Sequence, residues 1–293
     1  MDYPLYGNKM LTRLIKIGRI IGPRLPLTVW KIYMLLFYNP LLKVYAKHAD
    51  WKELKLREGK NSSPDMPPPS LRLRIGGGLS EMSTQTFVTL GKGIADDIED
   101  ILQSQLKRNL SSFHDILDFG CGCGRVLIWL YRRASKPKYH GTDIDEEAIE
   151  WCKNNLKFAE FSVNKPFPPL DSRLEGFDFV YAISVFTHID EEMQNAWIQE
   201  LHRVLKPKGI LLISVLGQSA CKNMPKDIRH RLGSQGFVFV KLDITRGIFP
   251  SWYQLSYHTE GYVRQKFGKF FNLLSFMEKG LCGFQDVALL EKK

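Results

Sequence analysis

The chain has 293 residues, enough for one large α/β domain with an appendage, and its shares of hydrophobic (44%) and charged (25%) residues are typical of globular proteins. Its five cysteines show no disulfide pattern, which argues against a disulfide-rich scaffold and indicates a reducing compartment. The formal net charge is +10, but residues 1–60 hold twelve Lys/Arg and four Asp/Glu and account for +8 of it. The remainder is nearly neutral, which argues against a nucleic-acid footprint on the main domain.

Residues 1–60 are predicted to form a basic helical extension of two pieces. In residues 9–21 the helical period separates cations from apolar side chains, namely Lys9, Arg13, Lys16 and Arg19 from Met10, Leu14, Ile17 and Ile21. Gly22-Pro23 ends this piece. The second piece, residues 29–46, is more apolar and aromatic, and Pro40 is expected to interrupt it.

The extension has two interpretations. Its longest uncharged run, residues 32–42, has 11 residues, well short of the ~20 that a membrane-spanning helix needs, and no signal-peptide pattern is present. Residues 9–46 either lie as a basic amphipathic element on an anionic membrane or grip a partner, or they pack on the main domain with their lysines in solvent. Residues 61–70, rich in Pro and Ser, are predicted to be a stiff linker between the extension and a domain at 71–293.

The central motif is Ile116-Leu-Asp-Phe-Gly-Cys-Gly-Cys-Gly-Arg125, in which an apolar, β-prone start leads into a glycine-rich turn, and a predicted helix follows from Val126 to Tyr131. Glycines at every second position let the backbone turn tightly and approach a ligand, and the next helix presents its first N–H groups there. A dinucleotide fingerprint would need a third glycine at Arg125, and the Lys-Ser/Thr end of a phosphate-binding Walker loop is absent. Asp143, 19 residues beyond Gly124 and at the end of the next predicted strand, can accept hydrogen bonds from ribose hydroxyls.

Together, the Asp-x-Gly-x-Gly-x-Gly turn and the acid that ends the next strand resemble the class I S-adenosylmethionine-dependent methyltransferases. The segments 177–188, 205–214 and 284–290 look like that family's fourth strand, fifth strand and closing strand. The resemblance covers about residues 70 to 293. It implies a Rossmann-like, doubly wound α/β fold: a mostly parallel seven-stranded sheet with helices on both faces, here with a helical N-terminal extension.

The resemblance also implies S-adenosyl-L-methionine as the cofactor and a set of cofactor-binding residues: Asp118, Gly120, Cys121, Gly122, Gly124, Asp143, Ile144, Asn164 and Ser184. Asn164 stands where the common pattern has an acid or a small polar residue near the adenine. Cys121-x-Cys123 has no second Cys/His pair beside it, and the glycine turn already explains its spacing, so no metal site is expected.

Two histidines are candidates for a general base, which a hydroxyl acceptor would need. His188 follows the predicted fourth strand, and His258 lies in an expected substrate-side insertion at 217–265. For both, helix capping or burial in the core is the alternative. In the same insertion, Trp252, Tyr253 and Tyr257 either line a substrate pocket or cover the sheet edge.

The sequence leaves the acceptor open. The turn that adenine-N6-type methyltransferases carry after the fourth strand is absent, and Ser184-Val-Phe-Thr-His188 occupies its place. The leading hypothesis is a cytoplasmic enzyme that methylates a small molecule, on oxygen before nitrogen or carbon, and that associates with a membrane through its N-terminus. Methylation of RNA or protein with the basic arm as a clamp, and a non-catalytic module of the same fold, are the alternatives. The oligomeric state is not indicated.

Overall fold

The computed structural model describes residues 27–57, 66–76, 82–242 and 248–293. They divide into two compact units. We call residues 1–89 and 241–253 the N-terminal unit, and residues 90–240 and 254–293 the sheet unit. The predicted helix at 9–21 lies outside the described residues.

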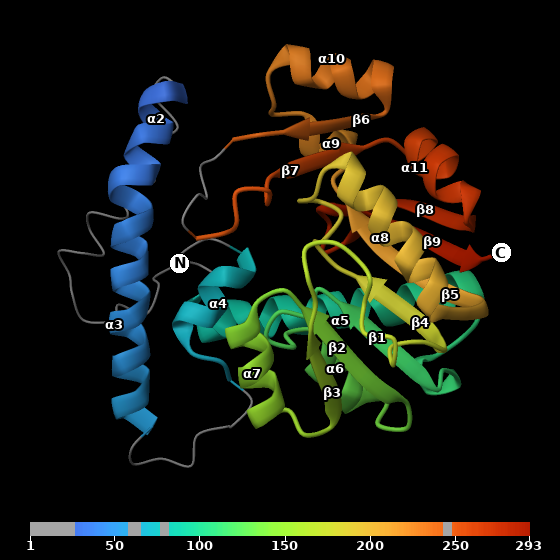
Figure 1. Ribbon diagram of the computed structural model, residues 1–293, viewed down its shortest axis with the longest axis horizontal. Helices are drawn as coiled ribbons and strands as arrows, with labels where there is room; N and C mark the ends of the chain where they lie inside the picture. Colours follow the sequence, from blue (N-terminus) through green and yellow to red (C-terminus); the bar gives the residue numbers. More distant parts are fainter. Residues whose placement is uncertain (1–26, 58–65, 77–81, 243–247) are drawn as a thin grey trace. The chain divides into compact units, whose positions relative to one another are not determined.

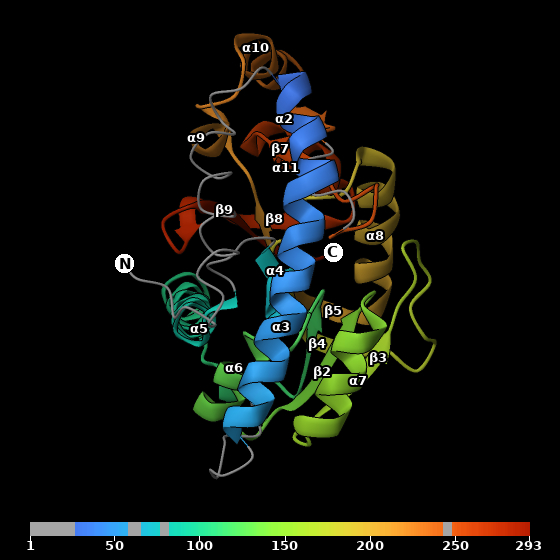
Figure 2. The same ribbon diagram turned by 90° about the vertical axis from the view of Figure 1, so that its left-hand side faces the viewer.

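The N-terminal unit contains one continuous helix followed by a short one (Figure 2). The long helix consists of α2 (Leu27–Tyr33), the π-helical turn η2 (Met34–Tyr38) and α3 (Asn39–Arg57), and α4 (Pro69–Gly76) follows. Pro40 was expected to interrupt the helix, but the chain widens into the π turn just before it and then continues. In this turn the N–H of Asn39 donates to the carbonyl of Met34, five residues back, so the missing N–H and the bulk of proline are accommodated without a break.

The linker prediction is wrong for residues 66–70, because these residues pack against α3. The N–H of Ser70 donates to Oδ1 of Asp50 at 2.8 Å. The guanidinium of Arg72, which is fully buried, forms an ion pair with Glu53 and donates to the carbonyls of Pro67 and Met82. Residues 71–89 consequently belong to the N-terminal unit and not to the main domain, where the sequence had placed them.

The sheet unit is built on a seven-stranded sheet in the order β3-β2-β1-β4-β5-β9-β8 (Figure 1). Strands β1 to β5 pair in parallel, whereas β9 is antiparallel to both β5 and β8. This confirms the predicted fold. The strand bounds are β1 Asp115–Phe119, β2 Lys138–Asp143, β3 Ala159–Val163, β4 Phe177–Ala182, β5 Leu205–Val215, β8 Phe271–Leu281 and β9 Gln285–Lys292.

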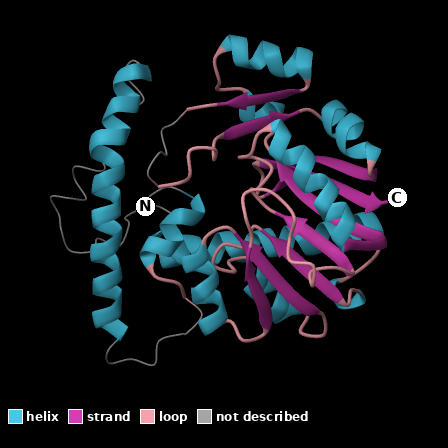
Figure 3. Cartoon of the chain, in the orientation of Figure 1, coloured by secondary structure: helices cyan, strands magenta, loops and turns pink. Residues whose placement is uncertain are grey.

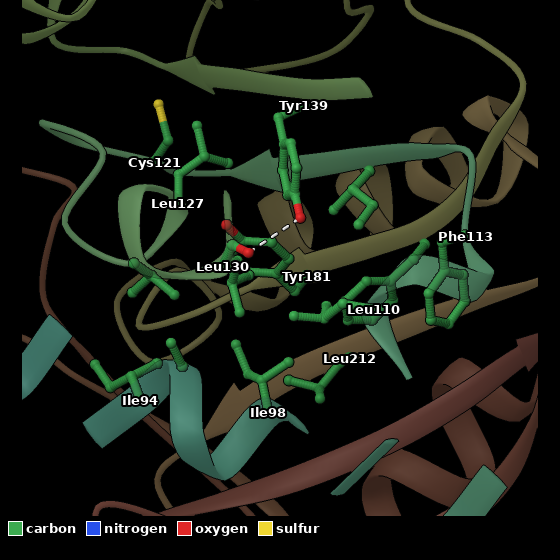
Figure 4. Close-up of a cluster of buried hydrophobic side chains, with 14 of the residues drawn as sticks. Ile94, Ile98, Leu110, Phe113, Cys121, Leu127, Leu130, Tyr139, Tyr181 and Leu212 are labelled. Atoms are coloured by element: carbon green, nitrogen blue, oxygen red, sulfur yellow. Dashed lines mark hydrogen bonds between the residues drawn. The ribbon is translucent and has the colours of Figure 1, made fainter. Parts of the chain in front are cut away.

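Helices pack on both faces of this sheet (Figure 3). The helices α5 (Thr84–Leu106), α6 (Leu127–Arg133) and α7 (Glu146–Asn155) share one hydrophobic core with the sheet (Figure 4). In this core the hydroxyl of Tyr139 donates to the carbonyls of Leu130 and Ala134. On the other face, Trp197 of α8 (Glu191–Val204) lies against Phe119, with ring centroids 4.6 Å apart. The strand order reverses between β1 and β4, and in sheets of this kind ligands bind beyond the carboxyl ends of the strands at such a point.

The predicted insertion at 217–265 contains a small two-stranded antiparallel sheet of β6 (Phe237–Val240) and β7 (Leu255–His258). Around it lie the helices α9 (Gln218–Cys221), α10 (Lys226–Gln235) and α11 (Glu260–Lys266), with the short turn η5 (Phe267–Lys269) after them. Residues 241–253 leave the insertion and belong to the N-terminal unit, a division that the sequence did not predict.

Candidate cofactor site and active site

The glycine turn forms a closed loop between β1 and α6. All three glycines have positive φ, with +81° at Gly120, +52° at Gly122 and +69° at Gly124. A Cβ atom on Gly120 would lie 2.3 Å from Cγ2 of Val185. Because side-chain-bearing residues rarely adopt this backbone conformation and the space is taken, only glycine fits. The spacing read from the sequence therefore reflects a steric requirement.

Asp143, at the end of β2, holds this loop in place. Its Oδ2 accepts a hydrogen bond from the N–H of Gly122 at 2.7 Å, and its Oδ1 accepts one from the N–H of Asp145 at 2.9 Å. Asp145 in turn caps α7, accepting from the N–H of Ala148. The N–H of Ile144 also bonds this carboxylate, which has about four acceptor sites, so three bonded N–H groups leave capacity for a ribose hydroxyl on the half-buried side chain.

A second acid, Asp118 of β1, is buried on the strand beside Asp143. Burial raises the pKa of Asp118 to about 8, with the charge of Asp143 adding to the shift and Tyr181 and Arg125 opposing it. Burial also raises the pKa of Asp143, although the N–H groups of Asp145 and Gly122 counteract this. Because desolvation disfavours the ionised form of both groups, a cationic ligand beside them would stabilise their carboxylates. The pair therefore fits a positively charged ligand.

Asn164 joins this group at the end of β3. Its N–H donates to the carbonyl of Asp143 at 3.0 Å, and its Oδ1 accepts from the hydroxyl of Thr142 at 3.0 Å. Ile144 follows Asp143 and is half-buried. Cys121 is buried, its N–H donates to Thr142, and its thiol points to the carbonyl of Gly122. The side chain of Cys121 therefore contacts the loop itself, and its predicted contact with the cofactor stays a prediction.

Ser184 lies where β4 ends, in the left-handed region with φ +60°. Its N–H donates to the hydroxyl of Ser214 at 2.7 Å. Its own hydroxyl accepts from Nε2 of Gln285 at 2.8 Å. Ser214 and Gln285, on β5 and β9, are residues that sequence reasoning missed. No local pattern could have found Gln285, because it is 101 residues from Ser184.

His188 lies in the turn between β4 and α8, four residues after Ser184. Its Nδ1 is 2.7 Å from the carbonyl oxygen of Gln254, and the N–H of Gln254 returns a hydrogen bond to the carbonyl of His188. Because a carbonyl can only accept, Nδ1 carries the proton and the lone pair of the neutral ring is on Nε2. Burial lowers the pKa of His188 to about 4, although the bond to Gln254 opposes the shift. At neutral pH the ring is therefore uncharged and able to accept a proton at Nε2.

His258 occupies a different environment, because its side chain is fully buried in β7. Gln194 of α8 donates from Nε2 to the carbonyls of Phe186 and Ile189, so its Oε1 must accept from Nε2 of His258 at 2.8 Å. The structure thus places His258 in the core. There it hydrogen-bonds Gln194, which in turn bonds to the turn that carries His188. This geometry agrees with the alternative of core burial and gives a catalytic role no support.

We expect His258 to make the sheet unit less stable as the pH falls below neutral. Burial lowers its pKa to about 3 from 6.5, so between these values the unfolded chain binds more protons than the folded one. The contribution of the neutral His258 to the free energy of unfolding is therefore fully present above about pH 6.5. As the pH falls toward 3, this contribution declines by about 1.4 kcal/mol per pH unit for one proton. Urea unfolding between pH 7 and pH 4 measures how the free energy of unfolding changes with pH. In His258→Gln this slope should be smaller by the amount that corresponds to about one proton. An unaltered slope in His258→Gln would contradict the assignment.

The three predicted substrate-binding aromatics do not share one environment. Tyr257 is buried in β7, 4% exposed, and packs in the core of the sheet unit. Trp252 and Tyr253 are half-buried and belong to the N-terminal unit, where the ring of Tyr253 stacks on Phe249 with centroids 4.4 Å apart. The structure thus supports core packing for Tyr257, whereas a substrate-binding role for Trp252 and Tyr253 stays a prediction.

The groups at the carboxyl ends of β1, β2 and β3 fit S-adenosylmethionine, which combines a ribose with a sulfonium cation. Asp143 can accept from the ribose, and the three glycines of the loop let the backbone approach the ligand closely. The strand order, the loop after β1 and the acid after β2 together define the class I, S-adenosylmethionine-dependent methyltransferase fold. This is the class in which the sequence motifs had placed the chain.

Comparison with known proteins leads to the same class. Residues 116–209 match the model of the methyltransferase-domain family. Methyltransferase GfsG of Streptomyces halstedii is 26% identical over 111 residues, which are 36% of this chain and 39% of that protein. Ribosomal protein L11 methyltransferase of Dictyoglomus turgidum is 30% identical over 135 residues, 45% of this chain and 41% of that protein. These matches thus span about two fifths of the curated relatives.

Among solved structures, magnesium protoporphyrin IX methyltransferase (ChlM) from Synechocystis PCC 6803, with bound SAH, is similar with a TM-score of 0.50. It is 18% identical, and the match covers 82% of this chain and 100% of that one. At this identity the likeness shows the fold alone. Residues 116–209 thus match a methyltransferase domain, and the seven-stranded sheet has the fold of the class I, S-adenosylmethionine-dependent methyltransferases.

Proposed function

We propose that the protein transfers a methyl group from S-adenosylmethionine to a small-molecule acceptor, with a hydroxyl oxygen as the preferred nucleophile. The observation that carries the proposal is the joint arrangement of Gly122 and Asp143. The acid that would bind the ribose also fixes the turn that would receive the cofactor. When bound, S-adenosylmethionine supplies a methyl group that its sulfonium already activates. What remains for the protein is to hold the acceptor in line and to receive its proton.

In this proposal, the loop from Gly120 to Gly124 and Asp143 bind and orient the cofactor. His188 receives the proton of the acceptor hydroxyl at Nε2, because its Nδ1–H is already committed to Gln254. The contact with Gln254 also fixes the orientation of the ring, and it favours the imidazolium that forms when the proton arrives, since Nδ1–H remains a donor. His188 is thus the residue that makes an oxygen acceptor the favoured one.

Calorimetry with S-adenosylmethionine tests the cofactor part of the proposal. We expect the purified chain to bind it, and we expect Asp143→Ala to weaken binding by about 100-fold, since hydrogen bonds to a charged group contribute about 1.5–3 kcal/mol each. Asp171→Ala, which removes an exposed carboxylate elsewhere in the sheet unit, is the matched control and should bind like the wild type. No binding at millimolar cofactor would overturn the proposal and favour a non-catalytic module.

A second candidate is methylation of a protein, which the similarity to ribosomal protein L11 methyltransferase favours. Incubation of the purified protein with methyl-labelled cofactor and fractionated cell extract distinguishes the candidates by the fraction that becomes labelled. Label in small metabolites is the expected result. Label in protein would favour the second candidate, and label in RNA would contradict both.

A further inference from the structure

The long helix of the N-terminal unit has two faces that differ sharply. One face is packed in the core of that unit by Met34, Tyr38, Leu42, Tyr45, Ala46 and Ala49. The other face, which we call the outer face, exposes large apolar side chains at helical spacing, namely Val29, Ile32, Leu36, Phe37, Val44, Trp51 and Leu54. Exposure reaches 62% for Phe37 and 63% for Val44. Scattered exposed hydrophobic residues are ordinary, but a row of seven along one helix face indicates an interaction surface.

The charges on this helix are separated in the same way. Residues 27–57 contain two acids, Asp50 and Glu53, and both are engaged inside the N-terminal unit, with Ser70 and with Arg72. The lysines on the outer face, Lys43, Lys47 and Lys55, are exposed. The ammonium of Lys55 lies 4.1 Å from the ring centre of Trp51. The outer face therefore combines apolar side chains with positive charge alone.

We infer that the outer face of the helix formed by α2, η2 and α3 binds an anionic lipid bilayer, with the helix axis parallel to the membrane surface. Charge complementarity selects this occupant, because phosphate headgroups are anionic and the outer face carries lysines between its apolar residues. Lysine is depleted at protein–protein interfaces, whereas helices that lie in a membrane surface combine Lys with Trp, Phe and Leu. Lysine stems can cover apolar depth while their ammonium groups reach the headgroups.

Vesicle co-sedimentation of the full-length protein tests the inference. We expect binding to vesicles of equal parts phosphatidylcholine and phosphatidylglycerol, and much weaker binding to phosphatidylcholine alone. The double variant Lys43→Gln, Lys47→Gln should lower affinity by roughly 30-fold, the equivalent of about 1 kcal/mol for each lysine. The double variant Leu36→Ser, Phe37→Ser should lower affinity by at least about tenfold, because both side chains would leave apolar surroundings.

The sheet unit provides matched controls. Lys136→Gln, Lys138→Gln removes two exposed lysines, and Leu274→Ser removes an exposed apolar residue of β8, and both should bind vesicles like the wild type. Unchanged circular dichroism spectra and melting temperatures show that the variants fold, which is expected for exposed positions. The inference is overturned if the wild type binds neither vesicle, or if the outer-face variants bind like the controls. A dimer that Leu36→Ser, Phe37→Ser dissociates would also overturn it, since a second copy would then cover this face.

Discussion

Replacement of His188 by alanine is expected to lower kcat by about 10²–10⁴-fold, the usual loss when a general base is removed. The reason lies in the geometry: Gln254 holds the proton on Nδ1, so the lone pair of the neutral ring is on Nε2. Cofactor binding in calorimetry should change little, because the loop and Asp143 are untouched. Turnover with the identified acceptor, at saturating cofactor, is the measurement.

The pH profile separates this role from a structural one. Since the pKa of His188 is about 4, its ring is neutral throughout the neutral range, and kcat should fall with acid only near pH 4 and not near 6.5. The exposed His114→Ala is the matched control and should keep wild-type kcat. Full turnover of His188→Ala would remove this residue from the mechanism and favour an acceptor that needs no base.

Replacement of Arg72 by methionine is expected to destabilise the N-terminal unit by about 3–5 kcal/mol, the cost of removing one partner of a buried ion pair. The fully buried guanidinium binds Glu53 through two nitrogens, at 2.7 and 3.3 Å, and donates to the carbonyls of Pro67 and Met82. Methionine would fill much of the volume but leave these acceptors unpaired. Urea unfolding of the full chain, followed by tryptophan fluorescence, measures the change.

Two further variants make the test specific. Arg72→Met, Glu53→Leu removes both charges, and it should recover part of the lost stability, because replacing a whole buried pair by apolar side chains is often neutral. Lys47→Met changes an exposed cation of α3, the helix that carries Glu53, and should stay within about 0.5 kcal/mol of the wild type. Equal stability of Arg72→Met and Lys47→Met would show that the buried pair does not hold the unit together.

The sequence predicted the sheet unit well because its signals are local. Ile94, Ile98, Ile101 and Leu102, spaced for a helix, are buried on α5. Met193, Trp197, Leu201 and Val204 likewise form the buried stripe of α8. These patterns depend on the period of one helix or strand, which neighbouring residues alone define.

The N-terminal unit was harder to predict, because distant segments form it. Nothing local in residues 67–72 shows that Ser70 bonds to Asp50, 20 residues away, or that Arg72 bonds to Glu53, 19 residues away. Proline at position 40 argued for an interruption, but the π turn before it accommodates the ring, and residues on both sides of the turn pack into one core. The predictions of a linker and of a helix break relied on composition, and tertiary contacts outweigh composition at both places.

Local spacing in the sequence was enough to predict the cofactor class. Steric limits require glycine at the turn, and one short strand–helix–strand connection brings Asp143 next to it. Both features appear as regular spacing in the sequence. The environments of the two candidate histidines, by contrast, depend on distant contacts. Their partners lie 66 residues away for His188 and 64 for His258, and these contacts put one ring in the turn after β4 and the other in the core. The burial and the tautomer of each histidine ring depend on which distant groups the fold brings next to it. The spacing of residues along the chain therefore does not predict them.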